Sequence, residues 1–131
     1  MPVGASYRTS GTARHSIRLH FLFVTSRARA ILTGEVADRV AEILTEIAAE
    51  EGCEALDVQV SDRLAYVELV GRPELAASQI ALRLRKHSAQ RLLSSFPELT
   101  PEGAVWVRPY LVSTYPISQE SATCFLEDYR S

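Results

Sequence analysis

Two kinds of hydrophobic pattern alternate along this chain, and their order limits the folds that the chain can adopt. Apolar residues recur with a strand-like period of two, or in short continuous runs, at residues 16–25, 54–60, 64–70 and 104–113. They recur at the three- and four-residue spacing of amphipathic helices at residues 34–51, 76–95 and 118–129. The elements therefore follow one another in the order β-α-β-β-α-β-α.

This order predicts an α+β fold. The first six elements are those of a ferredoxin-like split β-α-β sandwich, in which a four-stranded antiparallel sheet carries two helices on one face. The seventh element adds a C-terminal helix. The run from Phe21 to Val24 is apolar at consecutive positions, so we expect the first strand to be central and buried on both faces. We interpret residues 1–14 as a flexible N-terminal lead-in and residues 15–131 as one folded domain.

The composition is typical of a soluble globular domain, with 47% apolar and 23% charged residues. No apolar stretch approaches the roughly 20 residues that a membrane-spanning helix needs, and the first residues lack the apolar run of a signal peptide. We therefore expect a cytoplasmic protein that does not enter a membrane. Cys53 and Cys124 match no metal or redox spacing and lie in apolar contexts, so we expect buried free thiols.

The formal net charge of −2 conceals a strong segregation of charge along the chain. No acid precedes Glu35, the stretch from Glu35 to Asp62 holds nine acids and the single base Arg39, and no acid lies between Glu74 and Glu98. The bases of the two acid-free stretches are Arg8, Arg14, Arg18, Arg27 and Arg29, and then Arg83, Arg85, Lys86 and Arg91. This pattern favours a basic face that binds phosphate, although folding could instead even out the charges of ordinary solvated helices.

Several segments resemble, in their order and spacing, the single-tyrosine HUH transposase family of small bacterial insertion sequences. The resemblance covers about residues 15–129. Its segments are Phe21 to Thr25 with Arg27 and Arg29, Glu51 to Glu54, Ser78 to Leu99, Trp106 to Thr114, and Ile117 to Asp128. It implies the same ferredoxin-like fold, a homodimer in which two sheets join edge to edge, and single-stranded or hairpin DNA as the partner.

The resemblance also implies a mechanism. In this family a tyrosine on the C-terminal helix attacks a DNA phosphodiester and stays linked to the 5′-phosphate. A divalent cation, Mg²⁺ or Mn²⁺, polarises the scissile phosphate, and two histidines one residue apart on a strand hold that cation. A glutamine one turn beyond the tyrosine completes the site.

None of these four functional residues is present at its expected position in this chain. The two histidine positions, the tyrosine position and the glutamine position carry Arg63, Ala65, Phe125 and Tyr129. Arginine and alanine offer no lone pair to a metal, and phenylalanine has no hydroxyl. A shift of register does not restore the pair, because no histidine occurs between His20 and His87. We therefore expect no intact catalytic residue, no metal cofactor and no DNA cleavage.

We retain three hypotheses for function. The first is a transposase-family protein that binds single-stranded or hairpin DNA without cutting it. The residues expected to contact DNA are Arg14, Arg18, Arg27, Arg29, Arg83, Arg85, Lys86, His87 and Arg91. Within this set, helical spacing should bring Arg83, Lys86 and His87 into one patch.

The second hypothesis is an active, metal-dependent transposase whose site has moved. Tyr129, Tyr115 or Tyr66 would then be the nucleophile, and Asp62 or Glu68 would bind the metal through oxygen. The third is a dimeric ferredoxin-like regulatory or binding module that has no DNA partner, since this sandwich hosts many unrelated functions.

Two further expectations concern assembly and the histidines. Trp106 and Tyr110 make the fourth strand strongly apolar, so an exposed edge there would favour a dimer. His15, His20 and His87 form no pair at ligand spacing, and His20, between two apolar residues of a strand, should be buried with its hydrogen bonds satisfied.

Overall fold

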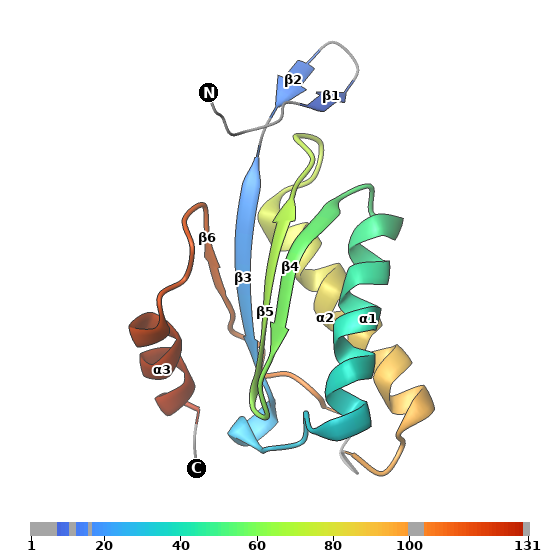
Figure 1. The fold of residues 1–131 in the computed structure, drawn as a ribbon, viewed down its shortest axis with the longest axis vertical. Coiled ribbons are helices and arrows are strands. Elements are labelled where there is room, and N and C mark those ends of the chain that lie inside the picture. Colours follow the sequence, from blue (N-terminus) through green and yellow to red (C-terminus); the bar gives the residue numbers. More distant parts are fainter. Residues whose placement is uncertain (1–7, 11–12, 16, 100–103, 130–131) are drawn as a thin grey trace.

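The computed structural model describes residues 8–10, 13–15, 17–99 and 104–129 of the chain. Four strands form one antiparallel sheet in the order β4-β5-β3-β6. These strands are β3 (Arg18–Val24), β4 (Glu54–Val60), β5 (Leu64–Val70) and β6 (Leu111–Ser113). Three α-helices complete the domain, namely α1 (Gly34–Glu50), α2 (Ala77–Ser95) and α3 (Gln119–Glu127). Helices α1 and α2 cover one face of the sheet, and α3 lies beside β6 (Figure 1). The predicted ferredoxin-like fold with its extra C-terminal helix is confirmed.

Strand β3 occupies the central position that its apolar sequence predicts. It pairs with β5 on one side and with β6 on the other, and every residue from Leu19 to Val24 is buried. Leu19, Phe21 and Phe23 belong to the core beneath α1 and α2, whereas the alternate residues turn to the opposite face. One strand thereby supplies the interior on both faces of the sheet.

The fourth strand is shorter than the sequence predicts. Residues 104–113 were expected to be extended throughout, but β6 contains only Leu111–Ser113, and Trp106 adds one isolated bridge to Thr25. Pro109 lies between the two paired parts, and a proline has no N–H to donate to a sheet. The strand is therefore split at the proline.

The N-terminal segment also contains paired structure. Strands β1 (Arg8–Ser10) and β2 (Ala13–His15) form a small antiparallel sheet inside the stretch that we interpreted as a lead-in. Residues 1–7 of that stretch lie outside the described residues. No helix in the described ranges has the length and hydropathy needed to cross a membrane.

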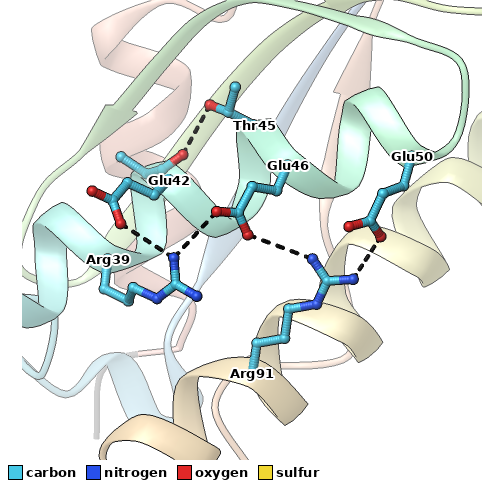
Figure 2. Close-up of polar contacts among 7 residues, drawn as sticks. Arg39, Glu42, Thr45, Glu46, Glu50 and Arg91 are labelled. Carbon is cyan, nitrogen blue, oxygen red and sulfur yellow. Dashed lines mark hydrogen bonds and ion pairs between the residues drawn. The ribbon is translucent and has the colours of Figure 1, made fainter.

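Ion pairs join α1 to α2 along the solvent side of their interface (Figure 2). The guanidinium of Arg91 lies 2.5 Å from a carboxylate oxygen of Glu50 and 3.7 Å from one of Glu46. Arg39 pairs with Glu46 from the other side, at 3.3 Å. The hydrogen bond from Arg91 lowers the pKa of the Glu50 carboxyl. The acidic outer face of α1 is therefore partly neutralised by bases of α2 as well as by its own Arg39.

Strand β4 forms one edge of the sheet and is irregular. Its register with β5 shifts between Ala55 and Asp57, so Leu56 has no regular partner and remains 40% exposed. A bulge of this kind bends the strand and interrupts its row of hydrogen bonds. The opposite edge, formed by β6, is regular but only three residues long.

The core predicts different costs for two leucines of α2. Leu84 is 1% exposed, whereas Leu82, two residues away, is 56% exposed. We expect Leu84→Ala to lower the free energy of unfolding by about 2–5 kcal/mol, because it leaves a cavity against the sheet. The matched variant Leu82→Ala should change it by less than about 0.5 kcal/mol. Urea unfolding followed by circular dichroism measures both, and equal losses would contradict the assigned faces of α2.

Candidate nucleic-acid interface

A cleft of about 560 Å³ lies on the sheet face opposite to α1 and α2. Strands β3, β4 and β5 provide one side of it, and the segment that enters α3 provides the other. Leu22 and Leu64 make part of the lining apolar, while Asp57 and Glu68 place two carboxylates in the same space. The cleft thus combines apolar contact with negative charge.

A hydrogen-bonded pair of rings, one from β3 and one from β5, lies on the sheet face that carries this cleft. His20 is 3% exposed, and its Nδ1 lies 2.6 Å from the hydroxyl of Tyr66, which lines the cleft. Burial raises the pKa of Tyr66, and the nearby carboxylates of Glu68 and Asp57 raise it further. Tyr66 therefore stays a neutral phenol at physiological pH, and the expectation of a buried, hydrogen-bonded His20 is confirmed.

The residues at the two expected histidine positions do not face the cleft. Ala65 is completely buried in the core beneath the helices, and the intervening residue Leu64 points into the cleft instead. Arg63 turns away and donates a hydrogen bond of 2.6 Å from Nη1 to the carbonyl oxygen of Ala28. Because one position is a buried methyl group and the other a fixed cation, the divalent cation of the family does not fit at these residues.

Arg63 has a structural role at the turn that follows β3. Arg27 and Ala28 have φ values of 58° and 51°, a left-handed conformation that side chains disfavour. The Arg63 side chain binds the Ala28 carbonyl, and the Arg63 backbone carbonyl accepts the N–H of Thr25 at 2.9 Å. These contacts hold the strained turn against the β4–β5 hairpin.

The expected tyrosine and glutamine positions lie together on α3. Phe125 and Tyr129 pack edge to face, with their ring centroids 5.1 Å apart, and both are half-buried. Ser118 caps this helix, because its hydroxyl accepts the N–H of Ser121 at 3.0 Å. The aromatic pair packs on itself, and it lacks both the hydroxyl of a tyrosine at position 125 and the amide of a glutamine at position 129.

The structure also places the two acids that were considered as metal ligands, and the two cysteines. Asp62 is exposed at the hairpin and Glu68 lies in the cleft, and the described residues contain no group of three histidine, cysteine or acidic side chains placed to hold a metal ion. Cys53 is buried as expected. The expectation for Cys124 is wrong, because this thiol is exposed on α3, a helix without fully buried residues.

Ion pairs with acids occupy two of the basic residues of α2. Arg83 lies 2.5 Å from a carboxylate oxygen of Glu51, and Arg91 pairs with two acids of α1. Lys86 is exposed, while the nearby His87 acts electrostatically on Glu50. The expected group of Arg83, Lys86 and His87 therefore has its first member in an ion pair.

The basic residues near the N-terminus lie at two ends of β3. Arg18 begins the strand and lies 3.6 Å from the carboxylate of Glu68. Arg27 and Arg29 follow its other end, about 20 Å away for a strand of this length. The side chain of Arg14 lies outside the described residues. These arginines therefore form no single patch.

A different pair of cations lies where α2 meets the split fourth strand, and the sequence reasoning included only one of them. The guanidinium carbon of Arg85 lies 4.8 Å from the centre of the Tyr110 ring, and its Nη1 donates to the backbone carbonyl of Arg108. The Arg108 side chain is exposed. The available signal was an arginine beside Pro109, in a stretch that reads as a continuous strand.

Trp106 and Tyr110 are covered by other side chains and form no exposed apolar edge, so they do not support the expected dimer. Trp106 is 9% exposed, and its Nε1 donates to the hydroxyl of Ser88 at 2.9 Å. Tyr110 packs on Phe21 and Phe23. The apolar side chains that remain exposed near this edge are those of Val112 and Tyr115.

The amino-acid sequence matches a known protein family and a known transposase. Residues 13–125 match the family described as "Transposase IS200 like". The ISDra2 transposase TnpA of Deinococcus radiodurans is 27% identical over 103 residues, which cover 76% of this chain and 74% of that protein.

Two solved structures share the fold. A crystal structure from Deinococcus radiodurans R1, assigned to the transposases, matches with a TM-score of 0.83 at 25% identity and covers 95% of this chain and 98% of that one. A REP-associated tyrosine transposase bound to a REP hairpin matches with a TM-score of 0.56 at 8% identity, over 92% of this chain and 70% of that one, so this second likeness concerns the fold alone. Because the family match spans most of the sequence and the arrangement of strands and helices agrees with it, the chain belongs to the IS200-like transposase family.

Proposed function

We propose that this protein binds single-stranded or hairpin DNA as a homodimer and does not cut it. Membership of a transposase family supports DNA as the partner. A structural relative with the same fold is bound to a REP hairpin, which supports a hairpin as the form of DNA. The sequence reasoning and the geometry of the cleft support the loss of cleavage.

The observation that carries this proposal is the chemistry of the cleft beside α3. Asp57 and Glu68 bring negative charge to the place where a scissile phosphate would enter between the sheet and the helix. A phosphodiester is itself an anion, so these carboxylates repel it unless cations outweigh them. Arg18 is the one cation that forms an ion pair with either of them among the described residues, at 3.6 Å from Glu68, so Asp57 has no cationic partner there.

The remaining tyrosines do not supply the lost nucleophile. A nucleophilic tyrosine works as a phenolate, and the pKa of Tyr66 is raised by burial and by Glu68 and Asp57, so it keeps its proton. Tyr129 packs against Phe125, and Tyr115 is 76% exposed outside the cleft. Tyr66 contacts the imidazole of His20, and no arginine or lysine contacts any of the three among the described ion pairs and ring contacts.

The proposal predicts that no covalent protein–DNA adduct forms. Single-stranded DNA that contains the hairpins flanking the gene, incubated with the protein and Mg²⁺ or Mn²⁺, should migrate unchanged on a denaturing gel. A family member with an intact tyrosine and histidine pair serves as the positive control under identical conditions. An adduct with the wild-type protein would overturn the loss of cleavage, and its absence from Tyr66→Phe or Tyr129→Phe would then identify a relocated nucleophile.

The proposal also predicts salt-dependent DNA binding. Fluorescence anisotropy with a labelled DNA hairpin that carries single-stranded tails should show binding at low salt. The logarithm of the association constant should fall linearly with the logarithm of the salt concentration, with about 0.7–0.9 of slope for each phosphate contacted. A protein that binds no hairpin at the lowest salt would instead favour a ferredoxin-like module without a DNA partner.

The homodimer in the proposal is expected to use the β6 edge. Val112 and Tyr115 are 42% and 76% exposed there, and β6 pairs with β3 alone. Sedimentation velocity should show a dimer that Val112→Asp combined with Tyr115→Ser converts to monomer. The control Leu82→Ser removes an apolar side chain of α2 that is 56% exposed, between the values of Val112 and Tyr115, and should leave the dimer intact. A wild-type monomer at high concentration would contradict this part of the proposal.

A further inference from the structure

Arg85 and Arg108 form a pair of neighbouring cations at the junction of α2 and the split fourth strand. Nη1 of Arg85 donates to the backbone carbonyl of Arg108, so one guanidinium lies beside the residue that carries the other. The charge of Arg108 acts on Arg85 and lowers its pKa, in addition to the larger effect of burial. The two positive charges are therefore held close to one another.

Packing fixes the position of Arg85. Its guanidinium lies over the ring of Tyr110, 4.8 Å from the ring centre, in the arrangement of a cation–π contact. The Tyr110 ring rests in turn on Phe21 and Phe23 of the central strand, with ring centroids 6.4 Å and 6.1 Å away. The aromatic side chains of the core thus hold the Tyr110 ring, and this ring orients the guanidinium of Arg85.

A chain of hydrogen bonds fixes the backbone on both sides of the pair. The hydroxyl of Ser88 donates to the backbone carbonyl of Arg85 at 3.1 Å and accepts the indole N–H of Trp106 at 2.9 Å. The segment around Trp106 is held to β3, because the N–H of Val107 donates to the carbonyl of Val24 at 2.9 Å. These hydrogen bonds therefore hold the backbones of the helix and the strand that carry the two arginines in a fixed relation.

This pair differs from the other arginines of α2 in having no counter-charge. Arg83 and Arg91 each lie 2.5 Å from a carboxylate oxygen. Neither Arg85 nor Arg108 has an ion pair with any residue in the described ranges, and Nη1 is the one donor of Arg85 that has an acceptor there. Its Nε is buried without a partner, a condition that folded proteins tolerate rarely.

We propose that Arg85 and Arg108 together bind a phosphate group of the DNA backbone, with Tyr110 as the platform that holds Arg85 in place. This inference rests on the proposed DNA binding and names the surface that performs it. A planar guanidinium with donors left over matches the oxygens of a phosphate, and a second cation beside it strengthens the attraction. The strand end at Pro109 leaves this corner of the sheet uncovered by the β6 ladder, which begins at Leu111.

The test compares equal losses of charge at two places. Arg108→Ala removes an exposed side chain whose backbone carbonyl, the acceptor for Arg85, remains. We expect it to weaken binding of the labelled hairpin by roughly five- to tenfold and to lower the salt slope by about one. Arg91→Gln removes one charge from an ion-paired site on the same helix and should leave affinity within about twofold.

Two further variants test the role assigned to the ring. Arg85→Lys keeps the charge but loses the planar guanidinium, so it should weaken binding. Tyr110→Leu removes the ring that holds Arg85 in place, so it should also weaken binding. The salt slope of Tyr110→Leu should equal that of the wild type, because no charge is lost. Circular dichroism and thermal unfolding confirm that each variant is folded before it is scored, and Arg108→Ala alone suffices if Tyr110→Leu unfolds.

The outcomes separate this inference from the proposal beneath it. A wild-type protein that binds no hairpin removes both. A wild-type protein that binds, with Arg108→Ala and Arg91→Gln equal in affinity and salt slope, leaves DNA binding in place and overturns the assignment to Arg85 and Arg108. A selective loss at Arg108 supports it.

Discussion

The burial of β3 on both faces is the constraint on which the rest of this structure depends. Six consecutive residues from Leu19 to Val24 are shielded from water, and such a strand is stable only between two others. Its pairing with β5 and β6 sets the strand order, and its odd-numbered side chains form the floor on which α1 and α2 pack. Its even-numbered side chains include His20, whose imidazole is hydrogen-bonded to Tyr66 on the face that carries the cleft.

Charge in this protein is distributed between holding helices together and remaining available to a ligand. Arg91 and Arg83 are used to bind the acidic edge of α1, so the helix richest in bases contributes little positive field from those side chains. Arg85 instead lies against an aromatic ring and the backbone carbonyl of Arg108, whose own side chain is exposed, so neither charge is balanced by an ion pair in the described ranges. Arg91 and Arg85, six residues apart on α2, thus have different surroundings, because Arg91 faces acids and Arg85 faces a ring.

The sequence predicts the element order and the central strand, because these depend on patterns within short windows. It does not predict which acid an arginine meets, since Arg83 and Glu51 are 32 residues apart and Arg91 and Glu50 are 41 apart. The two-residue period also hides which face of a strand is covered. Ala65 reads as a former ligand position, yet the pairing of β5 with β3 and the packing of α1 and α2 place it in the core. The split of the fourth strand was visible in Pro109, but the apolar residues on both sides outweighed it.

The bulge in β4 has a consequence for how sheets of this kind can assemble. A regular edge on both sides would allow each copy to add another on its left and on its right, and such contacts propagate into filaments. Here the bulge around Leu56 interrupts the β4 edge, so that edge pairs poorly with a further strand. The β6 edge is regular but short. A copy whose one border is bulged and whose other border is only three residues long offers no long template for further strands, and this opposes growth into filaments.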